Sequence, residues 1–538
     1  MADHIGARNM LAGQPIIILR DNVDVTSGRE AQHSNIMACK AIASAVRTTL
    51  GPRGMDKMLV SPSGDVVITN DGATILHEIS VEHPAAKMMI SVAEAQDDEV
   101  GDGTTTSCIL IGELMEEAER LFAKKIHPTV VANGYTLAME KALEILNENA
   151  IESKGEDKEL LVKVANTAVT GKSIEMMKEK ISSIVVDAVL AVAEKDENGK
   201  YSVDEDDVKI KTVVGDSLEE AELLSGFMID KTRCDEGMPK KVTNAKVALL
   251  AQPLEIKKTE TKSKIKITTS EQMEAFSDSE KAKLKEYADL IVASGANVVL
   301  CQKGIADAVQ YHLSHAGILA IQDVPEKDMK SFSRALHGTI VNSVKDLDES
   351  VFGNAESVEE MKDIKATKFT GCKNGKIVTI LLKGSNQIFV DELERATYDA
   401  ARVVMDALED GKFVVGAGAI DAELCLGLRS YAATVGGRTQ LAIEAFSNIF
   451  EAIPNTLAEN SGLDPIDVLV DLKSAHANGE KYAGINVFTG KIMNMYDEGV
   501  IEPMRVKRQA IQSAAETSAL LIRVDDMMVS KSAAQMNR

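Results

Sequence analysis

Apolar residues follow one pattern at the two ends of the chain and another in its middle. From about residue 30 to 200, and again after about residue 390, they recur every three or four positions, the spacing of amphipathic helices. In between, from about residue 205 to 385, short apolar runs bounded by turn formers indicate buried strands: "KVALLA", "NVVLCQ", "GILAIQ", "GTIV" and "KIVTILLKG". The predicted order is helical, α/β, helical. The two helical ends could form one interrupted domain or two separate domains, and spacing does not decide between them.

The composition is that of a soluble, acidic protein with several domains. A length of 538 residues corresponds to roughly three or four domains. Hydrophobic residues make up 45% of the chain and aromatic residues only 4%, so the cores are aliphatic. The net charge of −23 argues against nucleic-acid binding, which needs a basic surface, and favours cations such as Mg²⁺ or K⁺.

The cysteines and the N-terminus bear on the cellular compartment. The six cysteines are scattered singly, so neither a zinc site nor a disulfide framework is indicated. The first ten residues, "MADHIGARNM", lack the apolar region of a signal peptide, and no apolar run approaches the roughly 20 residues of a membrane span. We expect a cytoplasmic protein.

The stretch "EVGDGTTTS" combines features of a phosphate site with an acid. A helix is predicted to start near Thr104, where the first backbone N–H groups are unpaired and the helix dipole is positive. The hydroxyls of Thr104, Thr105 and Thr106 and the small Gly103 make this a good anion site. Asp102 is open to two interpretations. It could simply cap the helix, or it could take part in binding a ligand.

Two further loops favour a ligand. "TNDGATIL" places Asp71 and Gly72 ahead of a second helical run, and "LGPRGMDKML" offers Gly51 and Gly54, where backbone could approach a ligand closely. Three such loops within about 60 residues suit one polyphosphate. The acid is then explained if Mg²⁺ bridges its carboxylate and a phosphate.

"NTAVTGKS" is one residue short of a Walker A loop. Asn166 stands where the first glycine should be, and the preceding "KELLVKVA" is predicted to be helical, whereas a Walker A loop follows a strand. We therefore reject a P-loop. Lys172 could still reach a phosphate as a point charge, although alone it is typical of a surface lysine. Asp399, on a predicted helix, is by itself typical of a solvated acid.

Taken together, the motifs resemble the group II chaperonins, the archaeal thermosome and the eukaryotic cytosolic chaperonin. The likeness spans about residues 14 to 530 and looks more archaeal than eukaryotic. The segments that carry it are "GREAQHSNI", "TTLGPRGMDKML", "VVITNDGATIL", "VEHPAAKMM", "EVGDGTTTS", "HPTVVANGY", "VTGKS", "MPKKVTNAKVALL", "VTILLKGS", "DELERATYDA", "TLAENSGLDPIDVL", "INVFTGKI" and "GVIEPMRVKRQAI".

The resemblance implies a multidomain α and α/β fold of three nested domains. Expected are an equatorial ATP-binding domain at 1–152 and 405–538, an intermediate hinge domain at 153–222 and 372–404, and an apical substrate-binding domain at 223–371. A charged segment at about 255–290, which by composition alone is an ordinary solvated helix, corresponds to the family's helical protrusion, a built-in lid.

The resemblance also implies roles for individual residues. Asp102 matches the Mg²⁺-binding aspartate, and Gly103 to Thr106 match the phosphate contacts. Asp71 and Asp399 match the two acids that orient and deprotonate the attacking water, and Lys172 matches a lysine near the γ-phosphate. Gly484 and Asn486 lie in the family's base-contacting loop, and Glu502 matches a ribose contact. The remaining expected nucleotide contacts are Leu50, Gly51, Pro52, Gly416 and Gly418.

Two departures from the family pattern stand out. The family's "GGGA" nucleotide loop reads "GAGA" here, and the methyl group of Ala417 could restrict the backbone and alter nucleotide affinity. The usual Gly- and Met-rich tail is replaced by "SKSAAQMNR", which leaves the floor of the cavity open to question.

The implied function is that of an ATP-dependent molecular chaperone. It would enclose unfolded proteins in a double-ring cavity, with Mg-ATP hydrolysis closing the lid. Its partners would be unfolded clients and other chaperonin subunits, identical or paralogous, with no nucleic acid and no membrane. Met273, Phe276 and Leu284 of the protrusion could hold clients or could pack locally. The phosphate loops alone would also permit a small-molecule phosphotransferase that uses Mg-ATP, or a nucleotide-gated scaffold without turnover.

Overall fold

The computed structural model describes residues 23–61, 64, 66–153, 157–172, 177–197, 199–215, 221–256, 270–372 and 377–530. The chain divides into two compact units. The first unit joins Met1–Glu152 to Lys412–Arg538, and the second is Ser153–Gly411. Most of the two helical ends, up to Glu152 and from Lys412 onward, therefore belongs to one unit, which the middle of the chain interrupts. The finer division into equatorial, intermediate and apical domains stays a prediction.

The first unit is mainly helical, as the periodic pattern predicts. Its helices are α1 (Arg29–Arg47), α2 (Gly72–Glu78), α3 (Pro84–Val100), α4 (Thr104–Ala123), α5 (Pro128–Glu148), α12 (Ala419–Val435), α13 (Gly437–Asn448), α14 (Ala452–Asn460), α15 (Pro465–Ala477) and α16 (Met504–Leu521), with the 3₁₀ turn η5 (Ile449–Glu451).

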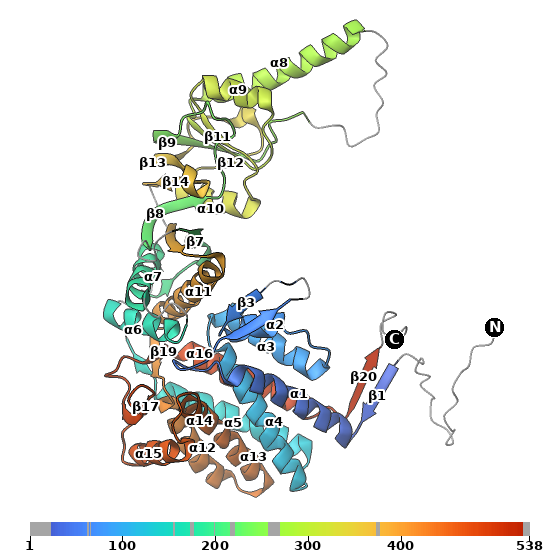
Figure 1. Cartoon of the computed structure of the whole chain (residues 1–538), viewed down its shortest axis with the longest axis vertical. Helices are drawn as coiled ribbons and strands as arrows, with labels where there is room; N and C mark the ends of the chain where they lie inside the picture. The colour runs from blue at the N-terminus through green and yellow to red at the C-terminus, as the bar shows by residue number, and fades with distance from the viewer. Residues whose placement is uncertain are drawn as a thin grey trace, which may run out of the picture. The chain divides into compact units, whose positions relative to one another are not determined.

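Helix α4 lies at the centre of this unit. Cys108, Ile109, Leu110 and Ile111 are four consecutive and completely buried residues, so apolar neighbours surround this helix on all sides. The helices α1, α3, α5 and α16 pack against it (Figure 1). The predicted start at Thr104 is confirmed. This packing holds the beginning of α4, where the phosphate site is expected, in a fixed place.

The strands of the first unit form small sheets. The antiparallel pairs are β1 (Val23–Ser27) with β20 (Asp526–Ser530), β2 (Lys57–Val60) with β3 (Val66–Thr69), and β17 (Ala483–Asn486) with β18 (Lys491–Asn494). A three-stranded sheet has the order β19 (Ile501–Pro503), β16 (Lys412–Val415), β4 (Ile151–Glu152). In this sheet the two separate stretches of the unit join, because β4 comes before the interruption and β16 after it.

A nine-stranded mixed sheet dominates the second unit. The strand order is β11-β10-β9-β13-β14-β8-β15-β7, and β12 pairs with β9. The strands are β7 (Val208–Val214), β8 (Glu222–Ile229), β9 (Lys241–Leu250), β10 (Val298–Cys301), β11 (Leu319–Ile321), β12 (Ile340–Val341), β13 (Gly353–Met361), β14 (Ala366–Thr370) and β15 (Val378–Gly384). All five predicted apolar runs are confirmed as strands, namely β9, β10, β11, β12 and β15.

The apolar pattern did not reveal the antiparallel strands β8, β13 and β14. Strand β13 reads "GNAESVEEM" and contains three glutamates, because only part of it faces the core. Its partners β9 and β14 supply the hydrogen bonds on both sides. A half-buried strand with charged outward positions gives no continuous apolar run, so its pairing could not be predicted.

Six helices complete the part of the second unit that the structure describes. They are α6 (Lys158–Val169), α7 (Lys178–Val192), α8 (Ser270–Ser294), α9 (Asp307–His315), α10 (Glu326–Leu336) and α11 (Gln387–Asp410), with the hairpin β5 (Glu194–Lys195) and β6 (Tyr201–Ser202) and the 3₁₀ turns η2 (Glu205–Asp207), η3 (Val344–Asp346) and η4 (Lys362–Ile364). The chain thus has one helical unit and one unit built on a mixed sheet, which confirms the predicted multidomain α and α/β class.

Helix α8 carries the part of the expected protrusion that the structure describes, and in Figure 1 it extends beyond the sheet. Residues 257–269 and the side chains of Met273 and Phe276 lie outside the described residues. Leu284 packs against the core beneath, close to the buried Ala288 and Ile291. Local packing is thus the role that the contacts of Leu284 support. Among the described helices, none is both long and apolar enough to span a membrane.

Candidate functional site

Helix α4 begins at a turn in which Asp102 does not act as the N-cap. Gly103 is the N-cap residue, with φ of 82°, and no side chain caps the helix. Instead, the backbone N–H of Gly103 donates to Asp102 Oδ1 at 2.7 Å. The interpretation that Asp102 merely caps the helix is therefore wrong. The first N–H groups of α4 have no partner within the helix, as at every helix start.

Asp71, in contrast, does cap a helix. Its Oδ2 accepts a hydrogen bond from the backbone N–H of Thr74 at 2.7 Å, at the start of α2. The junction at Asp71 thus uses its acid to cap a helix, whereas the junction at Asp102 leaves the start of α4 without a side-chain cap.

These two helix starts lie in direct contact. A Cβ atom built on Gly72 would lie 2.6 Å from Oγ1 of Thr105 and 2.8 Å from Oγ1 of Thr104. A side chain at position 72 would have to displace these hydroxyls, and the backbone nitrogen of Thr105 lies only 3.0 Å away. The structure therefore brings together the two junctions that the sequence singled out, with the positive start of α4 and two threonine hydroxyls in one place.

Gln96 on α3 holds the turn at Asp102 through hydrogen bonds to backbone carbonyl groups. Gln96 Nε2 donates to the carbonyl oxygens of Asp102, at 2.9 Å, and Val506, at 3.3 Å. A Cβ on Gly103 would lie 2.9 Å from Val506 Cγ1 on α16. The turn is thus wedged between α3 and α16. Gln96 carries no motif, and only the fold reveals its role.

The third predicted loop, Leu50 to Pro52, is anchored on α14. Asn460 Nδ2 donates to the carbonyl oxygen of Leu50 at 2.9 Å. Gly51 has a φ of 84°, and a Cβ there would lie 2.3 Å from Leu457 Cδ2. Glycine is thus needed at position 51 for both its conformation and its size.

The "GAGA" loop lies between β16 and α12. Gly418, with φ of 83°, is the N-cap of α12. A Cβ on Gly416 would lie 2.5 Å from Oε1 of Glu502, so the carboxylate expected at the ribose lies against this loop. Ala417 has a φ of 55°, a left-handed conformation that an alanine adopts only at an energetic cost. The departure from the family pattern therefore falls on a strained residue.

Strand β17 is tied to the same loop. The N–H of Ile485 donates to the carbonyl oxygen of Ala417 at 2.9 Å. A Cβ on Gly484 would lie 2.9 Å from that carbonyl oxygen, so Gly484 permits the close approach. The Oδ1 of Asn486 accepts hydrogen bonds from the N–H groups of Phe488 and Thr489, at 3.0 and 3.1 Å, and so stabilises the turn after the strand.

Four charged groups influence one another beneath these loops. Lys507 on α16 places its Nζ 3.1 Å from both carboxylate oxygens of Asp421 on α12, and both side chains are buried. Burial alone would lower the pKa of Lys507, but the charges of Asp421 and Glu502 raise it. Burial raises the pKa of Glu502, Lys507 opposes that shift, and the charges of Asp102 and Asp421 add to it. The expected metal ligand and the expected ribose contact therefore share one electrostatic environment.

Two expected site residues belong to the second unit. Asp399 on α11 is buried, and its Oδ2 forms an ion pair with Nζ of Lys172, which follows α6. Their side chains are only 12% and 13% exposed, so neither a solvated acid nor a surface lysine describes them. Lys172 follows a helix rather than a strand, which agrees with rejecting a P-loop.

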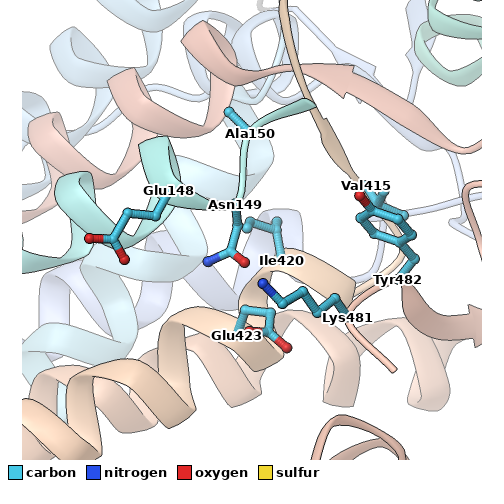
Figure 2. A pocket seen from close by; sticks show the side chains of 8 residues that line it. All are labelled: Glu148, Asn149, Ala150, Val415, Ile420, Glu423, Lys481 and Tyr482. Carbon is cyan, nitrogen blue, oxygen red and sulfur yellow. The ribbon is translucent and has the colours of Figure 1, made fainter. Parts of the chain in front are cut away.

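A cavity of about 100 Å³ borders the "GAGA" loop in the first unit. It is lined by Glu148, Asn149, Ala150, Val415, Ile420, Glu423, Lys481 and Tyr482 (Figure 2). Figure 2 shows Lys481 extending toward Asn149 above Glu423. Within the described residues, no cluster of three or more His, Cys, Asp or Glu side chains is arranged to hold a metal ion.

Comparison with known proteins identifies the family of the chain. A model of the TCP-1/cpn60 chaperonin family matches residues 42–532. The chain is 53% identical to a thermosome subunit beta of Archaeoglobus fulgidus over 523 residues. These aligned residues make up 97% of this chain and 96% of that protein. It is 51% identical to a thermosome subunit of Methanopyrus kandleri, over 97% of this chain and 96% of that protein, and 49% identical to one of Pyrococcus horikoshii, over 96% and 94%.

These similarities extend over nearly the whole chain and not over the phosphate loops alone. They give no support to the alternative of a small-molecule phosphotransferase. Chaperonins of this family hydrolyse ATP to drive protein folding. The chain therefore belongs to the TCP-1/cpn60 chaperonin family, as an ATP-hydrolysing chaperonin of group II.

Proposed function

We propose that the phosphates of ATP bind where the starts of α2 and α4 meet. The contact of Gly72 with Thr104 and Thr105 is the observation that carries this proposal. It places two hydroxyls at the N-terminus of α4, which no side chain caps, and both features attract phosphate. Gly103 adds a tight turn beside them, in which its N–H group donates to Asp102 Oδ1.

Asp102 is the proposed ligand of Mg²⁺, the metal that accompanies ATP. Its carboxylate lies beside Gly103, at the edge of the phosphate site, and carboxylate oxygens together with phosphate oxygens are usual ligands of Mg²⁺. When bound, the metal would neutralise charge that develops on the phosphates during hydrolysis. K⁺ is a second candidate ion, and its only support is the acidic character of the chain.

Asp71 and Asp399 are the proposed acids that orient and deprotonate the attacking water. Asp71 is fixed by its bond to Thr74, and Asp399 by its ion pair with Lys172. Lys172 would move from Asp399 toward the terminal phosphate when ATP is present. Because Asp71 and Asp399 belong to different compact units, we expect turnover to depend on movement of the hinge.

The sugar and base of the nucleotide are expected on the other side of the site. Glu502 would bind the ribose, and β17 with Gly484 and Asn486 would contact the base. The support is that Glu502 lies against Gly416 and that β17 is bonded to Ala417, which places both groups on the "GAGA" loop. Leu50, Gly51 and Pro52 would complete the contacts.

The proposed assembly is a pair of stacked rings in the cytoplasm that encloses unfolded clients under the built-in lid. The β2–β3 hairpin supports association between subunits. Met58 and Val60 are 66% and 65% exposed on β2, and Met55 just before it is 71% exposed. A two-stranded hairpin with an exposed apolar face is only marginally stable alone, and its open edges favour a partner.

Nucleotide binding by matched variants tests this proposal. Asp102→Ala should lose most Mg²⁺-dependent affinity for ATP, and Gly72→Ala should weaken binding because its Cβ displaces Thr105. Asp471→Ala on α15 removes the same charge from an exposed position of the same unit and should bind as the parent does. Normal ATP affinity in both Asp102→Ala and Gly72→Ala would refute the proposed phosphate site.

A further inference from the structure

His476 on α15 lies between a carboxylate and a backbone carbonyl group. Its Nδ1 is 2.6 Å from Oε1 of Glu423 on α12, and its Nε2 is 2.8 Å from the carbonyl oxygen of Ala483. The side chain of His476 is 0% exposed, and that of Glu423 is 19% exposed. Three elements, α12, α15 and β17, therefore meet at one imidazole ring.

Both partners of His476 present an oxygen atom to the ring. A carbonyl oxygen can only accept a hydrogen bond, so Nε2 donates to Ala483. On the other side of the ring, Nδ1 shares a hydrogen bond with Oε1 of Glu423. The ring is thus held at both of its nitrogen atoms, which fixes its orientation.

The carbonyl group that His476 holds belongs to the proposed base-contacting strand. Ala483 is the first residue of β17, and two residues later Ile485 is bonded to Ala417 of the nucleotide loop. Glu423 lies in α12, which starts directly after that loop at Gly418. Strand β17 is therefore fixed at Ile485 by the "GAGA" loop and at Ala483 by His476. Both restraints connect to the beginning of α12, since the loop directly precedes this helix and Glu423 lies in its first turns.

The neighbouring cavity explains why the hydrogen bond between His476 and Ala483 is needed. Lys481 and Tyr482, which directly precede Ala483, line the cavity together with Glu423 (Figure 2). The segment that leads into β17 thus borders a cavity, so close packing on that side does not restrain it, whereas the four residues of β17 itself are buried. A directional hydrogen bond between the buried ring of His476 and the carbonyl oxygen of Ala483 supplies the restraint at this entry to the strand.

We propose that His476, paired with Glu423, is a positioning residue that fixes β17 for recognition of the nucleotide base. It touches neither the phosphates nor the water. The inference rests on the proposed contact between β17 and the base. Loss of the pair should therefore weaken binding of nucleotides and leave binding of the phosphate part alone unchanged.

The test compares two ligands in the full-length chaperonin. In His476→Gln and in Glu423→Gln, the Kd for ADP and the KM for ATP should rise about tenfold, as expected when a buried hydrogen bond is lost, while kcat stays within about twofold. The inhibition constant of inorganic tripolyphosphate, which has phosphates but no base, should not change. The matched control is His33→Gln. His33 lies 3.1 Å from Glu119 in a pair of the same type that is exposed to solvent, and its loss should alter neither ligand.

Every result bears on the inference. Unchanged ADP affinity in either variant, or an equal loss for ADP and tripolyphosphate, would overturn it, because His476 would then support the fold in general. Failure of both variants to assemble would overturn it for the same reason. Gly484→Ala separates this inference from the proposed site, since its Cβ pushes β17 away from Ala417. Normal ADP affinity in Gly484→Ala refutes the base contact itself, whereas weak binding there with normal binding in His476→Gln refutes only the role of His476.

Discussion

Lys172 and Asp399 are separated by 227 residues and form a nearly buried ion pair within the second unit. The pair occupies both side chains that are proposed to act at the terminal phosphate. In this arrangement each side chain restrains the other. The pair thus links the proposed general base to the lysine that is proposed to act at the terminal phosphate.

Removing Asp399 should separate binding from turnover. In Asp399→Ala we expect ATP affinity close to that of the parent and a loss of ATPase activity of about 100-fold or more, the usual contribution of a general base. Steady-state ATPase assays and nucleotide titrations measure the two effects. Asp391→Ala, on the same helix but less buried, is the control and should hydrolyse ATP normally. Near-normal turnover in Asp399→Ala would contradict its assignment.

Breaking the buried pair of Lys507 and Asp421 should destabilise the first unit. Lys507→Met leaves a buried carboxylate without its partner, which costs about 3–5 kcal/mol. The double variant Lys507→Met with Asp421→Leu should recover much of that loss, because the carboxylate that bonds directly to Lys507 is then removed as well. Denaturant unfolding of the variants gives the free energies. The exposed pair of Lys141 and Glu144 is the comparison, and Lys141→Met should have little effect.

Glu502 should make stability depend on pH in a defined direction. Its pKa is raised in the folded state, so folding favours its protonated form. That contribution is fully present below the unfolded pKa of about 4.3 and is lost as the pH rises through the folded pKa. Glu502→Gln should therefore be about as stable as the parent protein at a pH below this unfolded pKa. It should become progressively more stable than the parent as the pH rises. Thermal unfolding across this range checks the sign, and a constant difference between the two proteins would contradict it.

Ala417 offers a test of backbone strain. Because its φ is 55°, Ala417→Gly should relieve strain and raise the free energy of unfolding by up to about 1 kcal/mol. The reverse change at the next residue, Gly418→Ala, introduces a side chain at φ of 83° and should destabilise by a similar amount. Equal stability of the two variants would mean that the loop relaxes around either residue.

The exposed β2–β3 hairpin predicts the outcome of native mass measurements. Two rings of eight or nine copies of this 57.9 kDa chain would weigh roughly a megadalton. Met58→Lys combined with Val60→Lys should shift the mass toward single subunits while the helical content remains. Met37→Lys is the control, since Met37 is a single exposed apolar residue on α1. An unchanged mass in the hairpin variant would show that this face is not an interface.

The sequence predicts well those features that local pattern determines. The start of α4, the apolar strands β9 and β15, and the meeting of two Asp-Gly junctions all follow from spacing, turn residues and helix-end chemistry. Strands with one charged face gave no such signal. The same is true of the supporting residues Gln96 and Lys507, which resemble any other polar residue of an amphipathic helix.

Those supporting residues act only through contacts that span the chain. Gln96 reaches a carbonyl group 410 residues away, and Lys507 reaches a carboxylate 86 residues away. No periodicity or motif encodes such pairs, because they depend on which helices become neighbours. The burial of Asp399 likewise follows from the packing of α11 against α6 and α7 and not from its own surroundings in the sequence.

The contact between Gln96 and Val506 also has a consequence for synthesis on the ribosome. The second unit is one continuous segment that is complete at Gly411, whereas the turn at Asp102 waits for α16 near the very end of the chain. Domains generally fold as units while the chain emerges. The proposed phosphate site therefore stays incomplete until α16 has emerged, at a stage when the second unit has all of its residues.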